Sequence, residues 1–513
     1  MRGFRMKNKS GKLLLDIENA IGQNAYSDAL SIIVENAVLL LSSSDIKPIM
    51  SLVMKIPDQF FETGLQKLIK GWICFLCGEN LILSQVLDDL PESALGTAME
   101  SSIFYSLKAI TNFARNPADS LKYAKLSVDI LEPDPDNFFY ANARLTYGHL
   151  LSAVGDHRRA INEFFSAYHL FKKCKGYFPA VVSLLNYGLK KHALGEIADI
   201  VTLFRNELTA CSGSDSRAIF NLLKLPLGIA YFELNRQSRA IKYLESVKTL
   251  INSLDFTHMF GVLEMHLVCA YAIVGRYDKA YSLIDELSGR LSCLNYDKIN
   301  NLCAALRVHI NTLEGTPVKA ADRELLEADY LMNGANTPAG TLLALARLKL
   351  KGEADNFNMN DLIACHKSLE TSPNIPFTQT AAILAAEYYY QLRETAICRE
   401  YLEKAADIFM NCRMSARFLI EKAGCLSMLK EINRDIYRLL DIKTETETVS
   451  DLLTQREKEI LSLIAQGFSN QQISQQLYIG TGTTKWHINN IFGKLNSKRR
   501  SQAVAQAKKL GLL

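Results

Sequence analysis

The sequence predicts an all-α protein in two parts: a long superhelix of helical hairpins, followed by a small four-helix domain. Two observations predict this fold. Glycine or asparagine recurs every 40 residues through the middle of the chain, between stretches of helical apolar periodicity. Residues 451–513 follow another pattern, with short amphipathic helices and a basic charge. We therefore expect a basic, flexible start at 1–14, a helical repeat at 15–442, a linker at 443–450 and a separate domain at 451–513.

The composition is that of a folded protein. Of 513 residues, 48% are hydrophobic and 22% are charged, which excludes a largely disordered chain. No apolar run approaches the roughly 20 residues that span a bilayer, and the start lacks the apolar core of a signal peptide. The eleven cysteines are odd in number and irregularly spaced, which indicates reduced thiols. The close pair Cys74 and Cys77 reads as one face of a buried helix. We expect a cytoplasmic protein that does not contact a membrane.

The net charge of +4 is divided unevenly along the chain. Residues 451–513 contain nine Lys or Arg against three acidic residues, a net charge of +6, so the preceding 450 residues sum to −2. A basic terminal domain on a nearly neutral body indicates that the terminal domain binds a polyanion.

The repeat places a turn residue between two amphipathic helices. Each unit joins its helices at Gly or Asn, because both residues tolerate the positive φ that follows a helix C-terminus. A small or branched apolar residue comes five positions later, and it allows the two helices to approach closely. The joints are Gly155, Gly195, Asn235, Gly275 and Gly315; the later positions are Ala160, Ile200, Ala240, Ala280 and Ala320; and a parallel series precedes the first three joints at Gly148, Gly188 and Gly228. These features resemble a tetratricopeptide-type repeat, whose stacked hairpins form a superhelix.

No catalytic or metal-binding pattern stands out in the repeat. The tyrosines Tyr147, Tyr187, Tyr231 and Tyr271 could line a ligand pocket, but helical repeats keep core rings at such positions. The histidines His149, His169, His266 and His309 show no paired spacing that assembles a metal site. Neither a nucleophile with its base nor paired carboxylates can be assigned from local spacing. We therefore expect no enzyme activity, no cofactor and no metal.

The terminal domain carries the functional signal. Thr454 and Glu457 form a capping box before a first helix at 454–466, Gly467 ends that helix, and Ser469 can cap the second. In the third helix, at 483–495, a four-three-four spacing forms an apolar stripe, which consists of Thr484, Ile488, Ile491 and Leu495. That stripe leaves Lys485, Trp486 and Asn489 on the opposite face, where such side chains can contact base edges in a major groove.

Several strings in this domain resemble the LuxR-type helix-turn-helix domain in register over 452–513: Leu-Thr-Gln-Arg-Glu at 453–457, Gly-Phe-Ser-Asn at 467–470 and Thr-Thr-Lys-Trp-His-Ile-Asn-Asn-Ile at 483–491. The form of the third helix and the closing Lys-Lys-Leu-Gly-Leu-Leu are similar to the MalT-like subgroup, which places such a domain behind a helical-repeat sensor. The entry to the third helix, Gly480-Thr481-Gly482, departs from the family's usual Ser-based cap.

The resemblance assigns roles to residues of the terminal domain. Lys485, Trp486 and Asn489 would contact bases, and a fourth helix would pair two copies on double-stranded DNA. By the resemblance, the residues near phosphates are Thr483, His487, Asn490 and Lys494. We expect Lys498, Arg499 and Arg500 to contact phosphate as well, because they lie in a basic domain next to the third helix. The fourth helix has a narrow apolar stripe, which we expect to form the dimer interface and which consists of Ala503, Val504, Ala507 and Leu510.

Two functions compete at this stage. The first is a sequence-specific transcription regulator, in which the repeat binds an inducer or protein partner and the DNA-bound protein contacts RNA polymerase. The alternative is an interaction scaffold whose terminal domain contacts protein instead of DNA. The amino-terminal ATPase of MalT-like proteins is not expected, because Ser10-Gly11-Lys12-Leu13, the string nearest to a Walker loop, lacks the leading Gly and the hydroxyl residue.

Overall fold

The protein is described by a computed structural model. The structure describes residues 2–43, 46–131, 136–211, 217–253, 261–292, 298–327, 346, 374–421, 428–432, 455–477, 481, 484, 487–488, 491–492, 497 and 499–509. Every regular element in these ranges is helical, so the all-α prediction is confirmed. The chain divides into two compact units, Met1–Leu440 and Asp441–Leu513. The expected linker, 443–450, lies outside the described residues.

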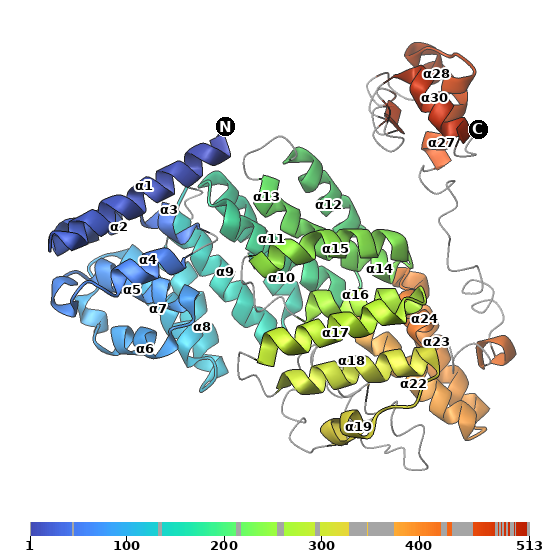
Figure 1. The fold of residues 1–513 in the computed structure, drawn as a ribbon, viewed down its shortest axis with the longest axis horizontal. Helices are drawn as coiled ribbons and strands as arrows, with labels where there is room; N and C mark the ends of the chain where they lie inside the picture. Colours follow the sequence, from blue (N-terminus) through green and yellow to red (C-terminus); the bar gives the residue numbers. More distant parts are fainter. Residues whose placement is uncertain are drawn as a thin grey trace. The chain divides into compact units, whose positions relative to one another are not determined.

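The first unit is a succession of antiparallel helices (Figure 1). Its first half contains α1 (Arg2–Gly22), α2 (Tyr26–Glu35), α3 (Ala37–Leu41), α4 (Lys47–Val53), η1 (Asp58–Phe60), α5 (Gly64–Cys77), α6 (Asn80–Asp88), η2 (Glu92–Ala94), α7 (Ala98–Asn112), α8 (Pro117–Asp129), α9 (Phe138–Ala153), α10 (His157–Lys173) and α11 (Tyr177–Ala193). The second half contains α12 (Ile197–Ala210), α13 (Arg217–Phe220), η3 (Asn221–Leu223), α14 (Lys224–Glu233), α15 (Gln237–Ser253), α16 (Val262–Ile273), α17 (Tyr277–Ser292), α18 (Lys298–Glu314), α19 (Ala320–Glu327), α22 (Ile375–Gln391), α23 (Thr395–Cys412) and α24 (Ala416–Ile420).

The start of the chain differs from our expectation. Residues 2–22 form the single helix α1 instead of a flexible segment at 1–14. Ile17 is fully buried and Leu13 and Leu14 pack against the core, so the helix is anchored by its second half. The preceding Lys, Arg and Met residues are good helix formers, which lets the helix extend from that anchor.

The joints of the repeat have the predicted backbone. Gly155, Gly195, Gly275 and Gly315 have φ between +73° and +88°, and Asn235 has φ of +56°. This is the left-handed region that ends a helix and turns the chain back. The two helices on either side of each joint pack on each other, as α9 on α10 and α14 on α15, so the predicted hairpins are confirmed.

Close approach between helices depends on the second glycine series. A Cβ on Gly188 would lie 2.6 Å from Phe204 Cζ and 2.9 Å from Pro226 Cβ, and Gly148 and Gly228 meet Phe164 and Leu244 in the same way. At the positions after the joints, Ala160, Ile200, Ala240 and Ala280 are fully buried. Ala320 is exposed because the turn at 316–319 contains Pro317 and delays the next helix, so that Ala320 becomes its first residue.

The repeat tyrosines lie in the core, as predicted, and each has a cation over the face of its ring. Tyr147, Tyr231 and Tyr271 are buried, and Tyr187 is half-buried. The rings lie under Arg159, Arg239, Lys279 and Lys191, at 5.6 to 5.8 Å from cation to ring centroid. Cys74 is also buried on α5, and burial raises the pKa of its thiol to about 11, so it stays protonated.

The last helices of the first unit fold back onto earlier ones. α22 contacts α11, and α24 contacts α14 and α16. This contact brings together side chains that are 184 residues apart in the sequence. Among the helices that the structure describes, none combines the length and the apolar character needed to cross a membrane.

Candidate nucleic-acid interface

The second unit contains the helices of the predicted terminal domain. Its described helices are α27 (Gln455–Ala465), α28 (Asn470–Gln476) and α30 (Arg500–Lys509). Between α28 and α30, the described positions 481, 484, 487–488 and 491–492 are helical. The helices follow one another in the order predicted for this domain, and the third helix is described at these positions only.

Local capping sets the first two helices. Gly467 has φ of +88° and ends α27, as predicted. Ser469 then caps α28. Its hydroxyl accepts a hydrogen bond from the backbone N–H of Gln472 at 3.3 Å, and Gln472 Oε1 accepts one from the backbone N–H of Ser469 at 2.8 Å. This reciprocal pair satisfies two helix-end amides and fixes where α28 begins.

The described residues of the apolar stripe on the third helix are buried, as its spacing predicts, while Leu495 lies outside the described residues. Ile488 and Ile491 are 4% and 0% exposed and belong to one core with residues of α27, α28 and α30. Thr484 is fully buried, and its hydroxyl shares a hydrogen bond of 2.8 Å with the Ser474 hydroxyl. This bond joins α28 to the third helix and fixes the rotation of the third helix about its axis.

Most of the residues expected to contact DNA are not among those that the structure describes. Lys485, Trp486, Asn489, Thr483, Asn490, Lys494 and Lys498 lie outside the described residues. Of the remaining phosphate candidates, Arg499 is exposed and His487 is half-buried.

Arg500 makes contacts within its own domain that the sequence did not predict. Its guanidinium donates to the Phe468 carbonyl and to Asn470 Oδ1, both at 2.6 Å, so it holds the α27–α28 turn against α30. These bonds use two of its donors, and the expected phosphate contact of Arg500 stays a prediction. A guanidinium with five donors in a planar fork suits this bridging role.

The fourth helix also corrects an expectation. Ala503 and Ala507 are fully buried in the core of their own domain, where their small side chains let α30 pack closely. Their partner is thus this domain, and they do not form a dimer surface. Val504 packs against the same core and stays half-buried, while Leu510 lies outside the described residues.

A comparison with protein families identifies this segment. Residues 451–507 match the family described as "Bacterial regulatory proteins, luxR family". The match covers the described helices of the second unit as far as Ala507. It confirms the resemblance that the sequence strings indicated.

The curated relatives match this chain over a stretch of similar length. The HTH-type transcriptional regulator AlkS of Pseudomonas putida is 34% identical over 77 residues, which are 15% of this chain and 9% of that protein. MalT of Vibrio campbellii is 48% identical over 58 residues, which are 11% of this chain and 6% of that protein. The response regulator VraR of Staphylococcus aureus is 49% identical over 57 residues, which are 11% of this chain and 27% of that protein. The chain thus spans at most 27% of the length of these relatives.

Solved structures give a weaker likeness over most of the chain. A Rap protein complexed with Competence and Sporulation Factor has a TM-score of 0.45 at 13% identity, covering 75% of this chain and 99% of that one. The apo form of the quorum sensor NprR from B. thuringiensis has a TM-score of 0.46 at 11% identity, covering 71% and 99%.

Proposed function

We propose that the chain is a sequence-specific, DNA-binding transcription regulator, because residues 451–507 match the luxR family of bacterial regulatory proteins. The observation that carries the proposal is the family match together with the register of the third helix. Its buried positions are Thr484, Ile488 and Ile491, so the stripe that faces the core is defined by contacts. The residues available to read DNA are then those of the other positions on this helix.

We assign base contacts to Lys485, Trp486 and Asn489. Lys can donate to guanine O6 or N7, Asn can form paired bonds with adenine, and an aromatic edge can meet a thymine methyl. Phosphate contacts are assigned to Thr483, His487, Asn490, Lys494, Lys498, Arg499 and Arg500. The charge of +6 on 451–513 supports this division, because phosphate contacts supply most of the affinity and base contacts supply the sequence preference.

The first unit is the sensor in this proposal, and it binds an inducer or a protein partner. Its stacked hairpins form a continuous surface, which suits recognition of another molecule. The protein acts in the cytoplasm, and RNA polymerase is its further partner at the promoter. Two copies bind half-sites about one helical turn apart. Since Ala503 and Ala507 are buried, the two copies pair through other surfaces, and we assign the pairing to the outer face of α30 or to the first unit.

The test is selection of a binding site by the full chain from a pool of random duplex DNA. The affinity for the enriched sequence and for a shuffled one is then measured at several salt concentrations. We expect the enriched sequence to bind at least about 10³-fold more tightly. We also expect log affinity to fall with log salt, by about 0.9 for each phosphate contact.

Two variants distinguish the loss of a phosphate contact from the loss of a positive charge elsewhere on the domain. Arg499→Ala should weaken binding to both sequences and flatten the salt slope by about one unit. Lys508 is equally exposed, but on α30, so Lys508→Ala is the matched control and should change neither value. If no sequence is enriched, the regulator proposal fails and the scaffold with a protein-binding terminal domain replaces it.

A further inference from the structure

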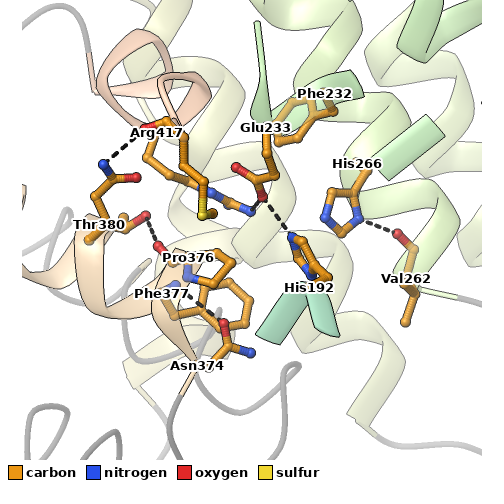
Figure 2. A network of polar contacts seen from close by, with 12 residues as sticks. His192, Phe232, Glu233, Val262, His266, Asn374, Pro376, Phe377, Thr380 and Arg417 are labelled. Carbon is orange, nitrogen blue, oxygen red and sulfur yellow. Dashed lines mark hydrogen bonds and ion pairs between the residues drawn. The ribbon is translucent and has the colours of Figure 1, made fainter. Parts of the chain in front are cut away.

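Four helices of the first unit bring a charged cluster into the core. His192 comes from α11, Glu233 from the end of α14, His266 from α16 and Arg417 from α24 (Figure 2). Glu233 is 0% exposed, His266 2%, Arg417 4% and His192 9%. A polar group that is buried this deeply is costly unless its hydrogen-bonding capacity is used.

One carboxylate oxygen of the cluster has two donors, although Arg417 Nε is buried and has no hydrogen-bond partner within the described part of the chain. Glu233 Oε1 accepts from His192 Nε2 at 2.9 Å and also from a guanidinium nitrogen of Arg417. The guanidinium in turn lies over the rings of Phe232 and Phe377, at 5.5 and 5.7 Å from their centroids. These contacts hold Arg417 beside Oε1.

The other side of the cluster has two open acceptors. His266 Nδ1 donates to the Val262 carbonyl at 2.7 Å, which leaves a lone pair on Nε2 (Figure 2). Within the described part of the chain, His266 Nε2 and Glu233 Oε2 are buried and have no hydrogen-bond partner. Burial, with His192 and Arg417 nearby, lowers the pKa of His266 to about 3, so its ring is neutral. Burial alone would raise the pKa of Glu233, but Arg417 and His192 lower it to about 2, so the carboxylate is charged.

Two buried acceptors without a donor call for a cation or a water molecule. One ligand atom from each of His192, Glu233 and His266 lies within 4.8 Å of the other two. Imidazole nitrogens and a carboxylate oxygen suit zinc, with bonds of about 2.0–2.2 Å. Tetrahedral ligand atoms are then on the order of 3.4 Å apart, a separation that small side-chain rotations can reach from the present one.

We propose that His192, Glu233 and His266 form a binding site for a divalent transition-metal ion of the zinc class. His266 Nε2 and Glu233 Oε2 are already open, and His192 joins them by taking the Nδ1–H tautomer and turning Nε2 to the ion. The Val262 carbonyl fixes the orientation of His266, and Arg417 keeps Glu233 Oε1 occupied, which are the supports that metal ligands need from their neighbours. The site joins α11, α14 and α16, and through Arg417 it ties them to α24.

The test uses the full chain, stripped of metal with a chelator and then titrated with zinc chloride alone. We expect one zinc per chain by elemental analysis and a higher unfolding temperature, because a ligand that binds only the folded state stabilises it. Cobalt chloride is the second probe. A tetrahedral site with nitrogen and oxygen ligands gives visible absorption bands without the ultraviolet band of cobalt bound to thiolate, which excludes binding by the cysteines.

Variants assign the ligands. His192→Gln and His266→Gln should each weaken zinc binding more than about 100-fold, since loss of a supporting group alone costs 10- to 100-fold. His157→Gln is the matched control, because His157 is also buried but lies on α10, and it should bind zinc as the wild type does. If His266→Gln does not fold, His192→Gln and the cobalt spectrum of the wild type decide. Zinc below one-tenth equivalent, or equal binding by the wild type and His192→Gln, overturns the proposal and assigns the space to water.

Discussion

The close contact at Gly188 gives a sharp test of the repeat architecture. Gly188 lies within α11, where Ala is normally the better helix former by about 0.5–1 kcal/mol. In this structure the new methyl group would lie 2.6 Å from Phe204 Cζ and 2.9 Å from Pro226 Cβ. Phe204 is fully buried and the Pro226 ring is rigid, so neither can move away freely. Overpacking of this kind costs about 1–3 kcal/mol, so Gly188→Ala should destabilise the first unit.

A second glycine provides the matched control. Gly289 lies in α17, is exposed, and has no atom within 4 Å of its added Cβ. Gly289→Ala should therefore stabilise the unit by about 0.5–1 kcal/mol. Thermal unfolding of the full chain, followed by circular dichroism, should show the two unfolding temperatures moving in opposite directions. The packing argument is refuted if Gly188→Ala is as stable as Gly289→Ala.

Three further predictions follow from single residues. Arg500→Ala should lower the stability of the second unit by about 1.5–3 kcal/mol, because two hydrogen bonds of a charged group are lost, and Arg499→Ala should leave it unchanged in urea unfolding. Ser469→Ala should cost about 1 kcal/mol through the lost cap of α28, seen in the same assay. Burial lowers the pKa of His157 to about 4, so the unfolded chain binds more protons than the folded chain between about pH 6.5 and pH 4. The free energy of unfolding should therefore fall as the pH drops through this range. His157→Gln should reduce that fall in unfolding measured at several pH values.

Local chemistry explains what the sequence predicted correctly. The joints at Gly155 and Asn235 follow from a backbone conformation that few residues adopt, so residue type alone indicates the turn. The cap at Ser469 and the buried stripe of the third helix depend on contacts within a few residues. Spacing can report such features directly.

The fourth helix shows where that reasoning stops. A stripe of small residues indicates that Ala503 and Ala507 pack against something, but it does not say what. The structure supplies the core of the same domain, with Ile460 and Ile491 among its members. Arg500 is a similar case, because a basic residue next to the third helix looks the same in sequence whether it bonds to phosphate or to the Phe468 carbonyl.

The buried cluster could not be found from spacing. His192 and Glu233 are 41 residues apart, and Glu233 and Arg417 are 184 apart, so no local pattern joins them. We expected no metal-site partners for His266 because that expectation considered only residues close to it in the sequence. The available signal was a charged residue inside an apolar run, Tyr231-Phe232-Glu233-Leu234, immediately before the joint at Asn235.

The central claim is that the third helix reads DNA bases, and its most direct test is the ratio of affinities for the selected site and a shuffled site. In the full chain, Lys485→Ala and Asn489→Ala should each reduce this ratio by about 5- to 150-fold, the equivalent of 1–3 kcal/mol, through weaker binding to the selected site alone. Lys508→Ala removes the same charge as Lys485→Ala from the exposed face of α30 and should keep the ratio. An unchanged ratio in Lys485→Ala and Asn489→Ala would contradict base readout by this helix.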